Sequence, residues 1–189
     1  MEWWNYMKFE YKFVSRWVVD GFIEINSQRS SFNGVTYVTD CLGDLLSALL
    51  YLNVNCISKD DGLRTNTSCE WNSEPYITTW NFTLRTNGML HVIVTNDGKE
   101  EDEDIVDIDT ECPYDSLLEI IVLEVDSLIK KHGIVGYKEN WDYEFPLSTF
   151  LKLKNYLLNK KSYLLEEIGD EYVEIKVSDL YKDIELFFK

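Results

Sequence analysis

Hydrophobic and polar residues alternate strictly in two stretches near the start of the chain. The first, residues 7–13, places Met7, Phe9, Tyr11 and Phe13 on one face and Lys8, Glu10 and Lys12 on the other. Residues 17–25 alternate in the same way, and a shorter stretch, 35–39, follows the turn signal Asn33-Gly34. Alternation with a period of two is typical of a strand with one buried face. The N-terminal third therefore predicts β-sheet.

The period changes to that of a helix after residue 40. The spacing i, i+3, i+4, i+7, i+8 is followed by Leu42, Leu45, Leu46, Leu49 and Leu50, which predicts an amphipathic helix. Asp40 stands directly before the first leucine and is placed to accept a hydrogen bond from an unpaired amide of the first turn. We therefore expect Asp40 to be the N-cap and Asp44 to lie on the solvent face.

Residues 69–97 predict a β-meander whose register follows from the apolar pattern. A two-residue loop at Asn87-Gly88 would mix polar and apolar residues on one face. A three-residue loop, 86–88, instead pairs Leu84 with Leu90, Phe82 with Val92 and Trp80 with Val94, because a slip of one residue exchanges the two faces of a strand. This register predicts that Gly88 has a left-handed backbone.

The next connection is strongly acidic. A tight hairpin at Asp97-Gly98 would bury carboxylates opposite Val92 and Leu90, which is costly without partners. Placing Val106 and Ile108 there restores the apolar pattern, so residues 97–104 are expected to form an exposed loop. From Asp97 to Glu111 there are nine acidic residues and one lysine.

The rest of the chain is mainly helical in pattern. One helix is expected from Pro113 to about His132, ended by Gly133, and another from Pro146 to about Lys160. Residues 136–146 between them are expected to be a loop packed over the core through its aromatic side chains. A strand at 172–177 and a short terminal helix capped by Ser178 complete the pattern. Together these elements predict one α+β domain, residues 1–189, with a largely antiparallel sheet of six to seven strands against three to four helices.

Composition and charge narrow the classes of partner. The chain has 189 residues, 45% of them hydrophobic, and a net charge of −16 from 34 acidic and 18 basic residues. This charge argues strongly against general nucleic-acid binding, because neutralising phosphates requires clustered Lys and Arg. A basic protein partner is expected instead. The partner-binding residues that we predict are Glu100, Glu101, Asp102, Glu103 and Asp104.

The sequence gives two indications of compartment. The start, MEWWNYMKFEYKF, has no basic leader followed by an apolar run, and no apolar run approaches the roughly 18 residues of a membrane span. The four cysteines, at 41, 56, 69 and 112, form no C-x-x-C pair. We therefore expect a cytoplasmic protein with reduced thiols and no membrane association.

Catalytic motifs are absent from the sequence. The two histidines, His91 and His132, lie far apart, and no nucleophile elbow, dinucleotide fingerprint, P-loop or metal-ligand spacing occurs. We therefore expect neither enzyme activity, nor a cofactor, nor a metal. The alternative is a carboxylate-dependent hydrolase with a site near Asp40 and Glu74, to which Asp44 and Glu70 contribute beside Trp71 and Trp80.

Three stretches together carry a resemblance: YVTDCLGDLL, WNSEPYITTW and GYKENWDYEFPLSTFLKL. Their order resembles a recurrent type of small, uncharacterised bacterial cytosolic protein, over roughly residues 17–158. The positions that match are Asp40, Asp44, Trp71, Glu74, Pro75 and Trp80. Such proteins are similar in style to the immunity proteins of bacterial polymorphic-toxin systems, which are often acidic α+β domains that plug a basic toxin's active site. The resemblance implies a noncatalytic inhibitor and transfers no catalytic residues.

A third interpretation is a structural or assembly protein. It would be favoured by a large apolar surface patch buried between subunits, for which Trp3 and Trp4 are the candidates.

Overall fold

A computed structural model describes residues 6–97, 105–170 and 173–189 of the chain. In these residues four helices and nine strands form an α+β architecture, which confirms the predicted class. The strands lie in three antiparallel sheets of three, four and two strands. The first seven strands are therefore divided between two sheets.

The first sheet contains β1 (Met7–Ser15), β2 (Val18–Ile25) and β3 (Gln28–Thr36) in that order. The expected strand at 35–39 is wrong, because β3 begins seven residues earlier and ends at Thr36. The tight turn lies instead at Asn26 and Ser27, which both have positive φ, 51° and 69°, as a type I′ turn requires.

Asn33-Gly34 forms a bulge inside β3 instead of a turn. Val19 pairs with Val35 and Gly21 with Phe32, so two residues of β3 lie opposite Asp20 alone. Gly34 has a φ of 69°, and its N–H donates to the Asp20 carboxylate at 2.7 Å. A glycine in the left-handed region is typical of such a bulge.

The second sheet contains β4 (Asn66–Asn72), β5 (Ile77–Leu84), β6 (Met89–Asn96) and β7 (Ile105–Pro113) in that order. The predicted β5–β6 register is confirmed at all three pairs, and Gly88 has the expected positive φ, 79°. The predicted β6–β7 register is wrong: Leu90 faces Cys112 and Val94 faces Ile108. The error is a slip of four residues, which an alternating pattern cannot detect because it keeps every side chain on its face.

Helix α1 (Cys41–Leu50) begins as predicted. The Asp40 carboxylate accepts a hydrogen bond from the Gly43 N–H at 3.3 Å, and Asp44 is exposed. Helix α3 (Leu147–Asn159) follows Pro146 and ends at Lys160, also as predicted.

Helix α2 (Tyr114–Trp141) is longer than predicted. Gly133 breaks its geometry with a φ of 72° and a ψ of 164°, but the helix resumes and continues to Trp141. The expected loop at 136–146 is therefore wrong for its first six residues. The aromatic side chains of this segment do pack into the core as expected, since Tyr137, Trp141 and Phe145 are buried.

The C-terminal region differs from the predicted pattern in two ways. A strand that was not predicted, β8 (Glu166–Asp170), pairs with β9 (Val173–Val177). Helix α4 (Leu180–Phe188) is capped by Asp179, whose carboxylate accepts from the Tyr181 N–H at 2.9 Å. The predicted cap, Ser178, instead donates to the Asp183 carboxylate.

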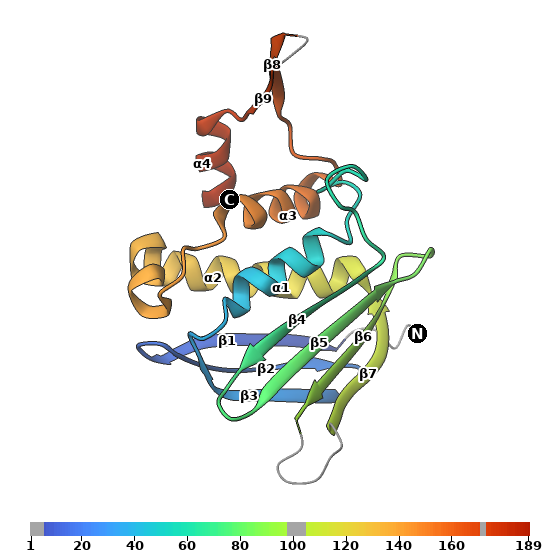
Figure 1. Ribbon diagram of the computed structural model, residues 1–189, viewed down its shortest axis with the longest axis vertical. Coiled ribbons are helices and arrows are strands. Elements are labelled where there is room, and N and C mark those ends of the chain that lie inside the picture. The colour runs from blue at the N-terminus through green and yellow to red at the C-terminus, as the bar shows by residue number, and fades with distance from the viewer. Residues whose placement is uncertain (1–5, 98–104, 171–172) are drawn as a thin grey trace.

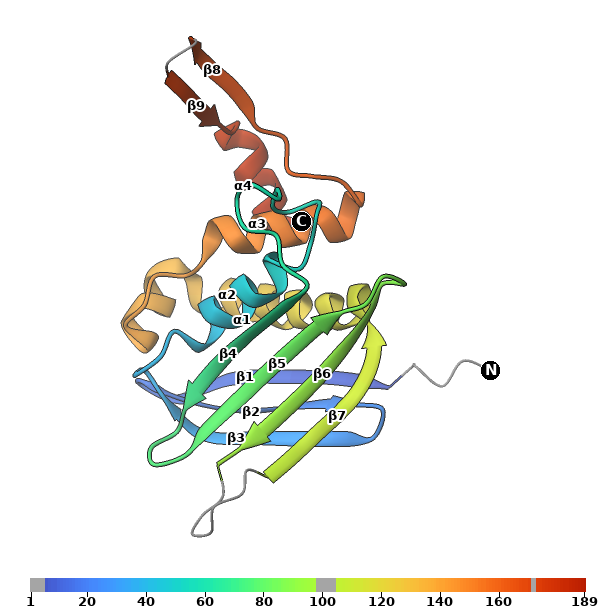
Figure 2. The same ribbon diagram turned by 45° about the vertical axis from the view of Figure 1, so that its right-hand side comes forward.

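The two larger sheets face each other across the core, and α1 and α2 lie along them (Figure 1). Phe32 of the first sheet meets Trp71 of the second at 4.6 Å between ring centroids, and Trp71 meets Trp80 at 4.8 Å. Helix α3 covers α1 and α2, and α4 with the β8–β9 hairpin projects beyond it (Figure 2). In the described part of the chain, no helix has both the length and the apolarity to cross a membrane.

Candidate functional site

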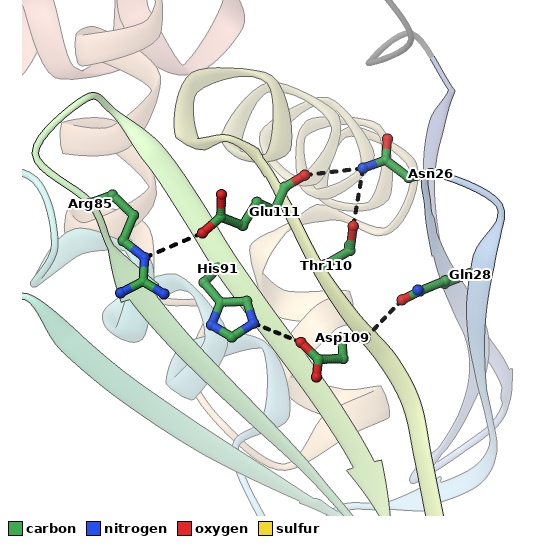
Figure 3. Close-up of polar contacts among 7 residues, drawn as sticks. All are labelled: Asn26, Gln28, Arg85, His91, Asp109, Thr110 and Glu111. Atoms are coloured by element: carbon green, nitrogen blue, oxygen red, sulfur yellow. Dashed lines mark hydrogen bonds and ion pairs between the residues drawn. The ribbon is translucent and has the colours of Figure 1, made fainter.

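Strand β7 carries a polar face on the outer side of the second sheet (Figure 3). Asp109 and Glu111 are two residues apart and so point to the same side of the strand. His91 of β6 lies 2.7 Å from the Asp109 carboxylate, and Arg85 lies 3.3 Å from the Glu111 carboxylate. The Asp109 side chain is 60% exposed and that of Glu111 is 47% exposed. Both carboxylates therefore remain open to solvent despite their basic neighbours.

The free edge of β7 is covered by side chains from the β2–β3 turn and from the first residue of β3. The Asp109 N–H donates to Gln28 Oε1 at 2.8 Å, and Asn26 Nδ2 donates to the Glu111 carbonyl at 3.0 Å (Figure 3). An exposed strand edge ordinarily invites another strand to pair with it. Because these two backbone groups are satisfied, this part of β7 presents side chains, and not unpaired backbone groups, to the solvent.

A third carboxylate of β7 has a structural role. Asp107 Oδ2 accepts hydrogen bonds from Asn96 Nδ2 at 2.5 Å and from Ser30 Oγ at 2.8 Å. Ser30 belongs to β3, so this network joins the two sheets. The free-energy cost of removing the Asp107 carboxylate from water is offset by these hydrogen bonds. Asp107 is therefore not part of the outward acidic face.

The predicted partner-binding residues, Glu100, Glu101, Asp102, Glu103 and Asp104, lie outside the described residues. They fall between the end of β6 at Asn96 and the start of β7 at Ile105. Asp109 and Glu111, which lie on β7, follow this segment in the sequence.

The two carboxylates at the centre of the predicted hydrolase site, those of Asp40 and Glu74, lie in different connections of the chain. Asp40 caps α1, and Glu74 is exposed in the β4–β5 connection, where its N–H donates to Asn72 Oδ1. Trp71 and Trp80 are fully buried in the core and present no ring to a substrate. Asp40 thus serves as a helix cap, and Glu74 lies at the surface in a strand connection.

Asp44 and Glu70 do line one groove. It has a volume of about 630 Å³ and runs between α1 and β4, with Arg64, Ser47 and Asn81 among its other polar residues. Neither carboxylate forms an ion pair with a described residue, and the Arg64 guanidinium lies over the Tyr51 ring. Partial burial raises the pKa of Asp44, since burial disfavours the charged form.

Burial also determines the chemistry of Asp40. Desolvation raises its pKa to about 6, against the opposing effect of the Gly43 N–H and with a further contribution from the charge of Asp44. A carboxyl group with this pKa is suited to proton transfer near neutral pH. No histidine, lysine or arginine of the described structure forms an ion pair with it.

The remaining reactive groups are poorly placed for nucleophilic catalysis. All four cysteines are free and buried, and burial raises the pKa of Cys41, Cys56 and Cys112 to about 12. These thiols therefore stay protonated, whereas the thiolate is the nucleophile. Among the described residues, no group of three or more His, Cys, Asp and Glu side chains is arranged to hold a metal ion.

The sequence patterns did not reveal the pair His91–Asp109 or the capping of β7 by Asn26 and Gln28. The first depends on the β6–β7 register, which the alternation leaves ambiguous by steps of two. The second joins residues more than 80 positions apart. Neither leaves a local signal in the sequence.

Comparisons of the chain with protein-family models, with curated proteins and with solved structures find no match. The resemblance to immunity proteins therefore remains a prediction.

Proposed function

We propose that this chain is a noncatalytic acidic binding protein that recognises a basic protein partner, as an immunity protein neutralises a cationic toxin. The single observation that carries the proposal is the outer face of β7. There Asp109 and Glu111 remain solvent-accessible on a strand whose edge is already capped. The strand directly follows residues 97–104, which contain six acidic residues and one lysine.

The physical role of this face is electrostatic steering. A surface whose charges have one sign raises the association rate with an oppositely charged partner and makes that rate depend on the salt concentration. The net charge of −16 acts in the same direction at longer range. Because β7 is held to the first sheet by Gln28, Asn26 and Asp107, its carboxylates keep their positions before the partner arrives. This preorganisation reduces the entropic cost of binding.

The test compares two variants of equal net charge. The first neutralises the predicted loop through Asp102→Asn, Glu103→Gln and Asp104→Asn. The second removes three exposed acidic residues elsewhere, through Asp60→Asn, Glu119→Gln and Glu167→Gln. The partner is captured on the immobilised wild-type chain from lysate of the native cells and identified. Its association rate with each chain is then measured by stopped-flow over a series of salt concentrations.

We expect the loop variant to associate about ten times more slowly at low salt and with a flatter salt dependence. The control variant is expected to show a much smaller effect, because its charges are remote from the face. Equal effects of the two variants on the association rate would show that residues 102–104 act only through the net charge of the chain. A captured partner with an acidic surface would refute the proposal itself.

The second candidate function is a carboxylate-dependent hydrolase, with its site at Asp44 and Glu70 instead of Asp40 and Glu74. The observation that favours it is the groove in which Asp44 and Glu70 both lack a described ion-pair partner. Under this candidate, Asp44→Asn or Glu70→Gln abolishes turnover of a substrate that the wild type hydrolyses, while Glu74→Gln has no effect. The assembly interpretation based on Trp3 and Trp4 concerns residues outside the described structure.

A further inference from the structure

Helix α2 is divided at Gly133 into a long first segment, residues 114–132, and a short second segment, residues 134–141. Gly133 has a φ of 72° and a ψ of 164°, which interrupts the helical geometry. Only glycine adopts these angles without strain. The end of α2 turns out of line with the rest of the helix (Figure 1). Gly133 is therefore a hinge between the two segments.

The second segment buries two aromatic side chains whose polar atoms are unpaired. The rings of Tyr137 and Trp141 are fully buried. Neither the Tyr137 hydroxyl nor the Trp141 Nε1 has a hydrogen-bond partner among the described residues, and the same holds for the hydroxyl of Tyr11 on β1. Burying a polar group without a hydrogen bond costs free energy. The docked segment is therefore less stable than its apolar contacts alone would make it.

Both tyrosines lie near the carboxyl group of Asp40 at the start of α1. Burial is the main cause of the raised pKa of Tyr11 and of Tyr137, and the charge of Asp40 raises both pKa values further. Asp40 Oδ1 accepts a hydrogen bond from the Gly43 N–H at 3.3 Å, and a Cβ atom on Gly43 would overlap Oδ2. The carboxyl group is thus held against α1, on the side that the tyrosines cover.

The surroundings of Asp40 offer no counter-charge to an ionised carboxylate. The titratable groups around it are neutral or acidic, and they are Tyr11, Cys41, Asp44, Tyr137 and Tyr143. Burial opposes ionisation of Asp40 most strongly and the charge of Asp44 adds to it, against one hydrogen bond from Gly43, so the pKa of Asp40 is about 6. Ionisation therefore favours any state of the chain in which water reaches this carboxylate.

Strand β1, which carries Tyr11, is fixed in place. It pairs with β2 along its length. The Tyr11 N–H also donates to the Glu124 carboxylate of the first segment of α2 at 3.0 Å. Moving Tyr11 away from Asp40 would disrupt the first sheet, so β1 does not open this site.

The second segment of α2 is held from outside by an exposed turn. The Trp17 N–H of the β1–β2 turn donates to the Asn140 carbonyl at 2.7 Å, and Arg16 Nε donates to the Glu139 carbonyl at 3.0 Å. These carbonyls belong to the last turn of the helix, where no intrahelical donor is available. Water can replace both bonds, so the second segment is the element that can move.

We propose that Asp40 and residues 134–141 form a proton-dependent latch, in which the neutral carboxyl group keeps the segment docked and loss of its proton to water releases the segment about Gly133. Release admits water to the Asp40 carboxylate and gives hydrogen-bond partners to the Tyr137 hydroxyl and to the Trp141 Nε1. It also frees the β1–β2 turn, which is bonded to the moving segment. The latch operates within a single chain, so this proposal and the proposed partner binding can fail independently.

The test measures amide hydrogen exchange of residues 137–141 by NMR between pH 5 and 8, with each rate corrected for the intrinsic exchange rate. Because Asp40 has a pKa of about 6 in the docked state and an ordinary one when released, we expect the opening equilibrium constant to rise about tenfold over this range. Residues 121–129 of the first segment report on global unfolding. Their amides are expected to exchange more slowly at every pH.

Asp40→Asn keeps an acceptor for the cap of α1 and removes the proton, so we expect it to abolish the tenfold dependence. The matched control, Asp60→Asn, removes an exposed carboxylate elsewhere and is expected to retain the dependence. An NMR titration of the Asp40 Cγ in the wild type needs no variant. The midpoint of that titration is expected to coincide with the pH at which the opening constant levels off.

Three results would overturn the latch. The first is exchange of residues 137–141 at the same corrected rate as residues 121–129, because the segment then opens only with the whole fold. The second is a wild-type opening constant that does not change with pH. The third is a pH dependence that the folded Asp40→Asn variant keeps or that Asp60→Asn loses.

Discussion

At the scale of single residues, Gly21 is a position where the first sheet has no room for a side chain. A Cβ atom there would overlap the Glu10 carbonyl oxygen and lie 2.5 Å from the Phe32 ring. We expect Gly21→Ala to lower the free energy of unfolding by about 1–3 kcal/mol, the usual cost of overpacking a core. Urea denaturation followed by tryptophan fluorescence measures it.

A matched control for this prediction lies in α2. At Gly136 the nearest atom to an added Cβ is 3.9 Å away, and the position is helical. Gly136→Ala is expected to be neutral or to stabilise by up to about 1 kcal/mol through helix propensity. If Gly21→Ala changed the free energy of unfolding as little as Gly136→Ala, this would contradict the close packing of Phe32 against Gly21.

Asp40 predicts a dependence of stability on pH. Its folded pKa of about 6 lies above the ordinary value, so the native state binds more protons than the unfolded state between about pH 4 and 6. The contribution of Asp40 to stability therefore falls as the pH rises through this window. Asp40→Asn keeps a capping acceptor and removes the charge.

We expect the wild type to lose about 1 kcal/mol relative to Asp40→Asn between pH 4 and 8, after allowance for screening by solvent. Urea denaturation of both chains at several pH values measures the difference. An exposed aspartate, through Asp60→Asn, is the control. A constant difference between wild type and Asp40→Asn would contradict the buried, desolvated state of this carboxyl group.

At the scale of elements, the docking of α4 depends on one buried lysine. Lys154 of α3 is 8% exposed in its side chain and donates to Asp126 Oδ1 at 2.6 Å and to the Phe187 carbonyl at 3.1 Å. Burial favours a higher pKa for Asp126, but hydrogen bonds from Lys130 and Lys154 outweigh it and lower the pKa. Lys154 thus joins α2, α3 and the last turn of α4.

We expect Lys154→Met to cost about 2–3 kcal/mol, somewhat less than breaking a fully buried pair because Lys130 remains beside Asp126. Amide hydrogen exchange is expected to quicken in α4 while α1 is unchanged. The control, Lys160→Met, removes an exposed pair with Asp115 and is expected to cost less than about 1 kcal/mol. Equal protection of α4 in both variants would show that the apolar contacts of Leu186 and Phe187 suffice.

At the scale of the whole molecule, the end of the second sheet where β6 stops and β7 starts lies opposite the β8–β9 hairpin (Figure 2). The described ends of β6 and β7 adjoin the predicted partner-binding segment, whereas α4 and the β8–β9 hairpin extend from α3 at the other end. The body between them is closed by capped sheet edges and an aromatic core.

The sequence by itself determined the elements whose signals are local. The Asp40 cap, the leucine stripe of α1 and the β5–β6 register with its left-handed Gly88 each depend on residues within a few positions of one another. The pattern also determined the α+β class and the acidic character of the segment that begins at Asp97. It did not predict β8, because its Glu166, Glu167 and Gly169 show no alternating apolar face.

Only the tertiary structure decided the features that join distant residues. The β6–β7 register, the capping of β7 by Asn26 and Gln28, and the placement of Asp107 between the sheets arise from contacts across the fold. A four-residue slip keeps every side chain on its face, so sequence periodicity cannot exclude it. The free energy of packing one sheet on the other selects the register, and with it the carboxylates that face solvent.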